Sequence, residues 1–463
     1  MNVTINSIIQ GFKKINKKII INGWIKTKRT SKKGILFISI YDGSCLKPCQ
    51  IIINKQIKNY NDILNLKIGY SVEIIGLLTL SIGKKQNFEI KAIKIKIVGL
   101  IKNLKKYPIT SKYHSKEYLR EIAHLRPRTN LISAITRIRH TLMQSIHKYL
   151  HKNNFLWIAT PLITCIDTEG YSNMFKVSTL NFNKIPYNNS NVNYKKDFFG
   201  KKTFLTVSGQ LTAETYACSC SKIYTFGPIF RAENSNTSRH LSEFWMIEPE
   251  IAFATLKDII NLSENMLKYI LKKILNKRYD DLYFLNNKIN KKKINHLINF
   301  IYYKFEQIDY SEAIKILLKS NINFKFPVKW GLDIFSEHER YLTDKYFKKP
   351  VIIKNYPKYI KSFYMKINKD YKTVSNMDIL VPEIGEIIGG SQREDKLNIL
   401  DKRIKESKLI KKKYWWYRDI RKYGSIPHSG FGLGFERILS YITGLKNIRD
   451  VIPFPRTPNS IEF

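Results

Sequence analysis

Two apolar runs on either side of a short polar loop constrain this chain more than any other feature. Residues 224–253 read YTFGPIFRAENSNTSRHLSEFWMIEPEIAF, and the loop carries Arg231, Glu233, Arg239 and His240. Apolar runs separated in this way are typical of two strands joined as a hairpin. We expect the charged side chains to gather at one end of a sheet, where an arginine can hold a phosphate by charge-assisted hydrogen bonds. An exposed, salt-bridged hairpin is the alternative, but the flanking apolar runs disfavour it.

The composition and net charge of the chain favour one class of binding partner but do not establish it. The chain has 463 residues, enough for two or three domains, and its 43% hydrophobic and 25% charged residues are ordinary globular values. Disorder and collagen-like repeats are therefore disfavoured. The formal net charge of +43 favours nucleic acid as a partner, although the codon bias of an AT-rich genome could produce part of the same lysine excess.

The cysteines and the N-terminal residues indicate where in the cell the protein is expected. The five cysteines, Cys45, Cys49, Cys165, Cys218 and Cys220, show no CxxC spacing. An odd number of cysteines without metal-ligand spacing favours reduced thiols, so we expect a cytoplasmic protein without a structural metal. The first residues, MNVTINSIIQGFKK, lack a signal-peptide core, and no apolar run is long enough to span a membrane.

Short β-rich runs broken by turns fill residues 19–100. The runs are KIIINGWIKTKRT, GILFISIYDGS, CQIIINK, YSVEIIGLL and FEIKAIKIKIVG. Five strands at this spacing predict a small closed barrel. Basic and aromatic residues alternate around Trp24 and Phe37, as on OB-fold surfaces that bind single-stranded nucleic acid. We assign an OB-fold domain to residues 1–100.

The remainder predicts a hinge and a larger α+β domain. Residues 101–130 carry Pro108 and Pro127 and are interpreted as a hinge or linker. Residues 131–463 mix strands and helices without regular βαβ alternation, which predicts an antiparallel β-sheet flanked by helices. The Lys-rich segment 271–325 is interpreted as a peripheral helical insertion.

Three motifs carry a family resemblance. FRAE, followed after a short loop by His240 and then Phe244, resembles motif two of the class II aminoacyl-tRNA synthetases. The run SGFGLGFERILSYITG at 429–444 resembles their motif three, in which a Gly-rich strand enters a helix near a signature arginine, here Arg437. FLWIATPLIT is similar to motif one, whose proline, here Pro161, lies at the homodimer interface in that family.

The order of domains resembles the aspartate, asparagine and lysine branch of that family, in which an OB-fold domain binds the anticodon. The strings FRAENSNTSRH, EFWMIEPEIAF, EIIGGSQRE and NIRDVIPFPRTPNSIEF resemble its asparagine-specific members. The resemblance implies ATP-dependent activation of L-asparagine to asparaginyl-adenylate, with release of pyrophosphate. It further implies transfer of the asparaginyl group to the 3′-hydroxyl of the terminal adenosine of tRNA(Asn).

The same resemblance assigns ATP binding to Arg231, Glu233, Arg239, His240, Phe244 and Arg437. It implies that Arg231 holds the α-phosphate and that Phe244 and Arg437 enclose the adenine ring. His240 and Arg437 would reach toward the γ-phosphate, and Glu233 would contact the adenine or the end of the tRNA. Arg231 and Arg437 are accordingly the expected catalytic residues.

The expected metal is Mg²⁺, because Asp378 and Glu386 resemble the acids that bind it in this family. No side-chain nucleophile is required, since the substrate carboxylate is already charged at neutral pH and attacks the α-phosphorus in line. Catalysis then consists mostly of positioning and charge neutralisation.

Asparagine and aspartate are nearly isosteric, so the pocket must select between them by charge and hydrogen bonding. In the aspartate enzymes a lysine stands three residues after the glutamine of this segment, but here Gln210 is followed by Ala213 at that spacing. Glu248 would accept a hydrogen bond from the side-chain amide and repel a carboxylate, and Arg393 would hold the amide oxygen. Gln210 and Glu169 are the candidates for the α-amino group. The alternative for Glu248 is a scaffold role beside a neighbouring arginine.

Aromatic residues at two places have alternative interpretations. In the barrel, Arg29, Phe37 and Gln50 match the family positions that contact the central anticodon base, whereas an ordinary barrel would bury Phe37 in its core. In the segment YWWYRD we expect Trp415 and Trp416 to be packed in the core above the motif-three strand.

The sequence leaves three other functions open. An aspartyl enzyme would need the cation that Ala213 replaces, and an ammonia-dependent asparagine synthetase would lack the barrel of residues 1–100. A non-enzymatic nucleic-acid-binding paralogue should have lost Arg231, Glu386 or Arg437, all of which are present.

Overall fold

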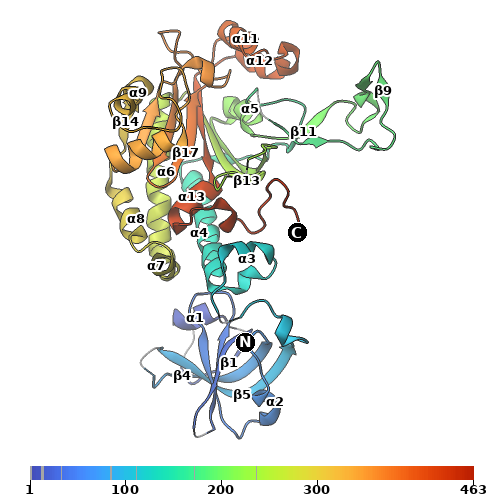
Figure 1. Ribbon diagram of the computed structural model, residues 1–463, viewed down its shortest axis with the longest axis vertical. Coiled ribbons are helices and arrows are strands. Elements are labelled where there is room, and N and C mark those ends of the chain that lie inside the picture. Colours follow the sequence, from blue (N-terminus) through green and yellow to red (C-terminus); the bar gives the residue numbers. More distant parts are fainter. Residues whose placement is uncertain are drawn as a thin grey trace. The chain divides into compact units, whose positions relative to one another are not determined.

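The computed structural model describes residues 3–11, 15–32, 34–83, 86–110, 112–170, 173–235 and 237–463. The chain divides into two compact units, Met1–Thr136 and Arg137–Phe463, whose elements are labelled in Figure 1. The division falls within helix α4 (Asn130–Lys152). The sequence predicts the boundary six residues earlier, between residues 130 and 131, near the start of this helix.

The first unit contains a closed barrel with the strand order β1-β2-β3-β5-β4. Its strands are β1 (Lys18–Thr30), β2 (Leu36–Tyr41), β3 (Cys49–Ile53), β4 (Ser71–Leu80) and β5 (Phe88–Gly99), with the short helices α1 (Ile5–Ile9) and α2 (Tyr60–Leu64). Neighbouring strands are antiparallel except β3 and β5, which are parallel. The predicted five-stranded closed barrel is therefore confirmed.

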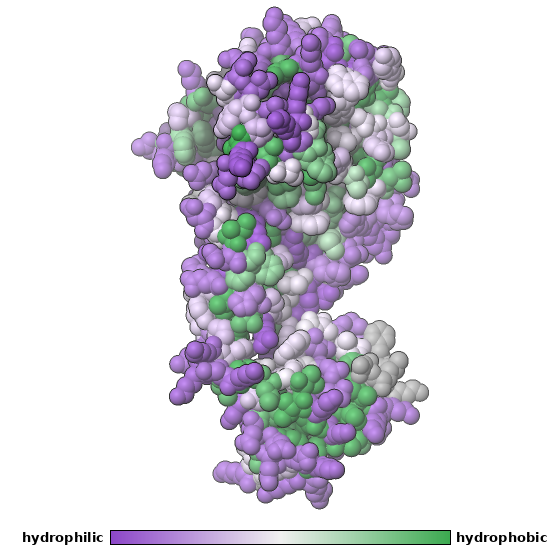
Figure 2. All heavy atoms as spheres, turned by 90° about the vertical axis from the view of Figure 1, so that its right-hand side faces the viewer, coloured by the Kyte–Doolittle hydropathy of each residue, from purple (hydrophilic) through white to green (hydrophobic). Residues whose placement is uncertain are grey.

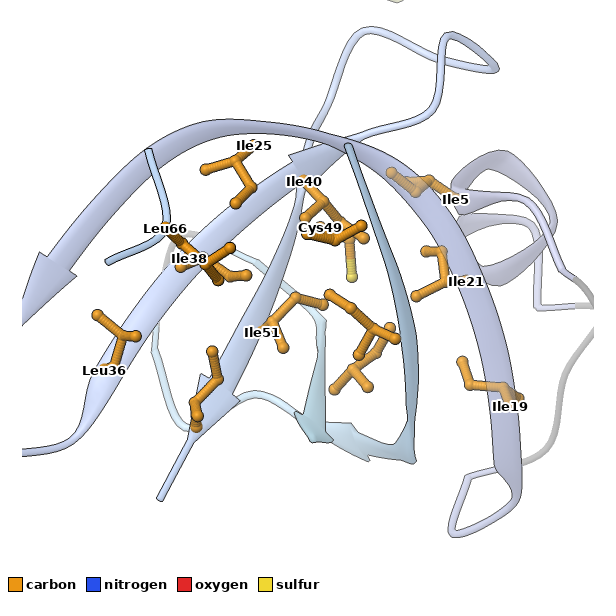
Figure 3. Close-up of a cluster of buried hydrophobic side chains, with 14 of the residues drawn as sticks. Ile5, Ile19, Ile21, Ile25, Leu36, Ile38, Ile40, Cys49, Ile51 and Leu66 are labelled. Carbon is orange, nitrogen blue, oxygen red and sulfur yellow. The ribbon is translucent and has the colours of Figure 1, made fainter. Parts of the chain in front are cut away.

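Branched apolar side chains fill the interior of the barrel. Ile19, Ile21 and Ile25 alternate with more exposed residues along β1, because successive side chains of a strand point to opposite faces. Ile38 and Ile51 project from β2 and β3 into the same cluster, as Figure 3 shows. The two-residue period of the sequence thus sets which side chains form the core and which face outward.

The segment that the sequence predicts as a hinge belongs to the barrel unit. It contains two 3-10 turns, Leu104–Lys106 and Arg126–Arg128, and the helix α3 (Lys116–Glu121). Ser115 caps α3, because its side chain accepts a hydrogen bond from a backbone N–H of the first turn.

The second unit is built on an eight-stranded sheet. In spatial order its strands are β14 (Glu306–Asp309), β15 (Val351–Lys354), β16 (Asn376–Val381), β17 (Gly385–Gln392), β18 (His428–Gly434), β13 (Glu243–Ala252), β12 (Lys222–Phe230) and β6 (Leu156–Trp157). The six central strands are antiparallel, as predicted, whereas both edge strands pair parallel to their neighbours. The α+β class is confirmed, and the sheet as a whole is mixed.

Several shorter elements complete this unit. They are the small sheet of β7 (Ile163–Thr164), β11 (Thr203–Leu205) and β8 (Lys176–Val177), the hairpin of β9 (Tyr187–Asn188) and β10 (Asn191–Val192), and the helices α5 (Gln210–Cys220), α9 (Tyr310–Leu318), α10 (Ser336–Arg340), α11 (Leu397–Glu406) and α12 (Trp415–Lys422). The β9–β10 hairpin projects from the body of the unit in Figure 1.

Helices α6 (Leu256–Lys277), α7 (Tyr279–Lys288), α8 (Lys293–Tyr302) and α13 (Phe435–Thr443) pack with the sheet or with one another. The segment 271–325 is not a peripheral insertion, because it supplies strand β14 of the main sheet and buries Leu297 and Phe300 of α8. A buried ion pair of 2.6 Å between Arg137 and Asp281 also fixes α7 to α4.

The surface differs from the expectation at one aromatic segment. Trp415 is 62% exposed, so its predicted core position is wrong, whereas Tyr417 in the same helix is fully buried. Because side chains two positions apart lie on different sides of a helix, only part of an aromatic run can face the core.

On the face shown in Figure 2, hydrophobic side chains gather on the barrel, whereas the second unit shows a mixture of hydrophilic and hydrophobic ones. Among the described residues, no helix combines the length and apolar composition needed to cross a bilayer.

The barrel core gives a test of this packing. Ile74 of β4 is fully buried, and we expect Ile74→Ala to destabilise the barrel by about 3 kcal/mol, because the truncation leaves a cavity. The outward-facing Ile93 of β5 is 47% exposed, and Ile93→Ala should cost less than about 1 kcal/mol. Hydrogen–deuterium exchange of barrel peptides measures both changes. Equal protection in the two variants would contradict the assignment of Ile74 to the core.

Candidate active site

The hairpin of β12 and β13 places the polar loop 231–242 at one end of the sheet. The two strands pair along their whole length. Directly after β12, the backbone N–H of Arg231 donates to the carbonyl of Ser242 at 2.9 Å, which fixes Arg231 at the base of the loop. The strand–loop–strand arrangement predicted from the sequence is confirmed.

One cavity brings together all six residues predicted to bind ATP. Its volume is about 120 Å³, and its lining includes Arg231, Glu233, Arg239, His240, Phe244 and Arg437. Met246, Ile387 and Ile448 also line it. These apolar residues were not identified from the sequence, because an apolar side chain in a pocket has the same sequence pattern as one in the core.

The Gly-rich strand β18 makes room for this cavity. A Cβ on Gly432 would overlap the Cε atom of Met246, so glycine allows that side chain to lie across the strand. The strand ends at Gly434, and α13 begins at the next residue, which places Arg437 in the first turn of the helix.

Phe244 supplies an aromatic face beside cationic groups. The guanidinium of Arg231 lies 5.5 Å from the centroid of the Phe244 ring, within the range of a cation–π interaction. This combination suits a ligand with a flat aromatic part and an anionic part, since a ring face and a guanidinium are available side by side.

Each of the two predicted catalytic arginines is paired with a carboxylate. Arg231 Nη2 lies 2.9 Å from Glu169 Oε1, and Arg437 Nη1 lies 3.1 Å from Glu386 Oε2. Burial raises the pKa of Glu169, although Arg231 opposes the shift. Burial also acts to raise the pKa of Glu386, but Arg437 and Lys361 outweigh it and hold that pKa below its usual value.

His240 is held by its own loop. Its Nδ1 atom lies 2.5 Å from Thr237 Oγ1 and 3.0 Å from Ser235 Oγ, and its Nε2 atom lies 4.0 Å from Glu233 Oε2. Burial lowers the pKa of His240 despite the nearby Glu233. The loop therefore orients the imidazole at the cavity without a charge on the ring at neutral pH.

A second cavity of about 450 Å³ adjoins the first and shares Arg239, His240, Glu386 and Arg437 with it. Its lining adds Ser336, Glu339 and Arg340 of α10 together with Lys446. Burial and the neighbouring Glu386 raise the pKa of Glu339 to about 7. Glu339 lies far from the three motifs in sequence, so no local pattern identifies it as a site residue.

Asp378 and Glu386, the predicted Mg²⁺ ligands, lie on the adjacent strands β16 and β17. A Cβ on Gly389 would lie 3.1 Å from Glu386 Oε1 and 3.5 Å from Asp378 Oδ1, so both carboxylates border the space above this glycine. Lys361 Nζ lies 2.7 Å from Asp378 Oδ2. Two carboxylates at one glycine-lined space fit Mg²⁺, which binds through one or two carboxylates and takes its other ligands from water and phosphates.

The predicted asparagine-binding residues are linked by shared partners. Gln210 donates to Glu214 at 3.0 Å, and Glu214 lies 4.0 Å from Arg393. Arg393 is almost fully buried, and two of its nitrogens donate to Glu250 at 2.5 and 3.2 Å. Arg393 and Gln210 are therefore held in place by two buried acids, Glu214 and Glu250.

Glu214 is the centre of this buried charge cluster. Its carboxylate lies 2.9 Å from Arg421 and 2.8 Å from both His428 Nε2 and the hydroxyl of Tyr417. Burial acts to raise the pKa of Glu214, but Arg421 and His428 hold it well below its usual value. The acid thus stays charged and keeps its partners fixed.

Glu248 is buried and accepts hydrogen bonds from uncharged groups. They are the hydroxyl of Ser208, the backbone N–H of Gly209 at 3.1 Å and the hydroxyl of Thr225 at 3.0 Å. None of these donors is an arginine, so the scaffold alternative in which an arginine neutralises Glu248 has no support from these contacts. Three neutral donors therefore hold the Glu248 carboxylate in place.

The three predicted anticodon residues lie together on the outside of the barrel. Phe37 is half-buried on the outward face of β2, between the inward-facing Leu36 and Ile38, so its alternative core position is wrong. The guanidinium of Arg29 lies 4.9 Å from the Phe37 ring centroid, and Arg29 donates to Gln50 at 3.3 Å.

Pro161, the predicted interface residue, is exposed a few residues after the edge strand β6. This strand ends at Trp157, and its pairing with β12 covers only two residues. Leu156 and Trp157 are 56% and 54% exposed, and Leu162 and Ile163 follow at 40% and 41%. A cavity of about 270 Å³, lined by Trp157 and Leu162 among others, opens beside this edge.

Known proteins match this chain over nearly its whole length. A family model described as tRNA synthetases class II (D, K and N) matches residues 115–458, and one described as an OB-fold nucleic acid binding domain matches residues 19–98. Asparagine–tRNA ligase of Serratia proteamaculans is 55% identical over 463 residues, which cover 100% of this chain and 99% of the relative. That of Photorhabdus laumondii is 56% identical over 458 residues and 98% of both chains.

Solved structures agree with these relatives. Asparaginyl-tRNA synthetase from Pyrococcus horikoshii, complexed with asparaginyl-adenylate, superimposes with a TM-score of 0.85 at 32% identity over 96% of both chains. The asparaginyl-tRNA synthetase of Entamoeba histolytica, also with asparaginyl-adenylate, gives a TM-score of 0.82 at 26% identity over 100% and 99% of the two chains. The chain therefore belongs to the class II tRNA synthetases and, within them, to the asparagine–tRNA ligases.

Proposed function

We propose that this chain activates L-asparagine with ATP and transfers it to the terminal adenosine of tRNA(Asn). The observation that carries the proposal is the single cavity that holds Arg231, Phe244 and Arg437, which come from two separate motifs of the sequence. Phe244 and Arg437 would enclose the adenine, and Arg231 would hold the α-phosphate. The other cavity residues, Glu233, Arg239 and His240, would contact the nucleotide from the loop.

Activation then proceeds by in-line attack of the asparagine carboxylate on the α-phosphorus. The bond between the α-phosphorus and the bridging oxygen of pyrophosphate breaks as the new bond to the carboxylate oxygen forms. Arg231 neutralises the charge that develops on the α-phosphate, and Arg437 neutralises the leaving pyrophosphate. Both side chains must first exchange their carboxylate partners Glu169 and Glu386 for the substrate.

We assign Asp378 and Glu386 to a Mg²⁺ site, because their carboxylates border the same space above Gly389. The ion would supply additional positive charge to the β- and γ-phosphates. Lys361 and Arg437 pair with these two acids and keep the negative charges balanced in its neighbourhood.

Selection of asparagine rests on Glu248, with Arg393, Gln210 and Glu169 as the other contacts. Glu248 would accept a hydrogen bond from the substrate amide, which an aspartate side chain cannot donate. A substrate with a second carboxylate would also place it against the Glu248 carboxylate, which three neutral donors hold in position.

A homodimer is supported by the exposed apolar edge at β6. Leu156, Trp157, Leu162 and Ile163 expose much of their surface beside Pro161, and large exposed apolar patches on globular proteins mark interaction sites. A second copy would cover this edge. We also assign the protein to the cytoplasm, a location consistent with its odd number of cysteines.

The decisive test is amino-acid-dependent ATP–pyrophosphate exchange with asparagine, aspartate and lysine in parallel. We expect exchange with asparagine alone, and Arg231→Ala should reduce it about a thousandfold, because the α-phosphate loses its cation. Arg418→Ala, which removes a surface partner of Asp401, is the matched control and should keep its activity. Exchange with aspartate would favour the aspartyl alternative, and exchange with none of the three would favour a non-enzymatic paralogue.

Phe37 allows a separate test of the barrel. Phe37→Ala should raise the KM for tRNA roughly tenfold, because one base loses its stacking partner. ATP–pyrophosphate exchange should stay unchanged, since this step needs no tRNA. Ile93→Ala, on the outward side of β5, is the control and should change neither rate. Equal loss of exchange and charging in Phe37→Ala would indicate a purely structural role.

Glu248→Gln tests the choice of amino acid. The variant keeps the shape of the side chain but removes its charge, so we expect the asparagine-to-aspartate ratio of kcat/KM in exchange to fall about tenfold. Glu264→Gln, in a partly buried i,i+4 ion pair on α6, should leave the ratio unchanged. An unchanged ratio in Glu248→Gln would remove this residue from substrate recognition.

A further inference from the structure

Glu339 lies in a segment that belongs to none of the three signature motifs, yet its side chain reaches the nucleotide site. It is in the short helix α10, and only 12% of its side chain is exposed. Its carboxylate lines the larger cavity together with Arg239, Glu386 and Arg437. An acid at this place contributes nothing to the contacts described above for ATP or asparagine, so its contacts within the protein indicate its role.

Glu339 connects two parts of the nucleotide site that are distant in sequence. Its Oε2 atom lies 3.5 Å from Arg239 Nη1 in the loop between β12 and β13. The same oxygen accepts a hydrogen bond from the backbone N–H of Glu386 at 3.4 Å, at the start of β17. One carboxylate therefore joins the loop that carries the cations to the strand that carries a predicted metal ligand.

The chain leaves space for this contact at Gly385. That residue has a φ of +86°, a conformation that favours glycine, and a Cβ on it would overlap Glu339 Oε2. Ser336, one turn earlier in α10, provides a second contact, since Arg239 Nη1 donates to its hydroxyl at 2.6 Å. Arg239 is thus held by two side chains of α10 at once.

The helix that carries Glu339 is itself firmly held. The neighbouring His338 is buried, with its Nδ1 accepting from Phe335 N and its Nε2 paired with Phe326 O, both at 3.2 Å. Leu342, three residues after Glu339, is fully buried in the adjoining core cluster. A carboxylate between two such anchors has a fixed position and can fix its partners in turn.

We propose that Glu339 is a positioning residue that holds Arg239 and the Gly385–Glu386 turn in the geometry required by the polyphosphate end of ATP. The proposal rests on the nucleotide site described under the proposed function. A free arginine in a loop has many rotamers and must lose them on binding, whereas Arg239 already has its direction set by Glu339 and Ser336. Glu339 acts on the β- and γ-phosphates through Arg239 and does not touch the adenosine part.

The test compares two nucleotides that differ only beyond the α-phosphate. Binding of AMP and of α,β-methylene-ATP to the full-length chain is measured by calorimetry for the wild type, Glu339→Gln and the control Glu337→Gln. Glu337 is in the same helix, but its carboxylate accepts from the backbone N–H groups of Lys325 and Phe326. We expect Glu339→Gln to weaken the binding of α,β-methylene-ATP roughly tenfold and to leave the binding of AMP unchanged, because only the triphosphate contacts Arg239.

A second variant keeps the proposal testable if Glu339→Gln folds poorly. Ser336→Ala removes the other contact of Arg239. It should weaken the binding of α,β-methylene-ATP more than that of AMP, by a smaller factor than Glu339→Gln does. In exchange assays both variants should raise the KM for ATP and leave the KM for asparagine unchanged.

Three outcomes would overturn the proposal. They are an equal loss of affinity for both nucleotides in Glu339→Gln, the expected selective loss of affinity appearing also in Glu337→Gln, and unchanged binding of α,β-methylene-ATP in Glu339→Gln. Failure of the wild type to bind either nucleotide would instead contradict the proposed function itself, so the two failures can be told apart.

Discussion

Strand β13 sets the layout on which the rest of this active site depends. Side chains of a strand alternate between its two faces, so Phe244, Met246, Glu248 and Glu250 all project from one face of the central sheet. Phe244 and Met246 line the cavity of the candidate ATP site, Glu248 lines the cavity beside the β6 edge, and Glu250 holds Arg393. The neighbouring strand β18 leaves space for this row, since a Cβ on Gly430 would overlap the carboxylate of Glu250. A single two-residue period therefore places residues of both cavities and the partner of Arg393 along one strand.

Charge pairing is the second constraint on the site. Arg231, Arg437, Lys361 and Arg239 each face a carboxylate, namely Glu169, Glu386, Asp378 and Glu339. Paired in this way, the cations have fixed directions, and the cost of burying each charge is offset by its partner. In the proposed reaction the triphosphate would take the place of these anionic partners. In the asparagine–tRNA ligase family this arrangement suits a reaction that depends on positioning and has no protein nucleophile.

Much of this arrangement follows from local sequence pattern, and particular residues show where the pattern fails. The loop between β12 and β13 and the glycines of β18 have distinctive spacing, and the structure places Arg231, Phe244 and Arg437 in one cavity as expected. Trp415 differs from expectation, because the orientation of a helix depends on the neighbours that it packs against. Segment 271–325 differs for the same reason, since its lysine content does not indicate the strand β14 that pairs with β15.

The sequence by itself determined the barrel, the α+β class, the family and the residues of the three motifs. The barrel and the α+β class depend on periodicity within short segments, which the chain carries regardless of its tertiary contacts, whereas the family and its motifs were identified by resemblance. Only the tertiary structure decided that Phe37 faces outward, that Glu248 is held by neutral donors and that Glu339 reaches Arg239 across about a hundred residues of sequence. The physical reason is that a contact between distant segments depends on how the sheet brings them together, and no local pattern records that distance.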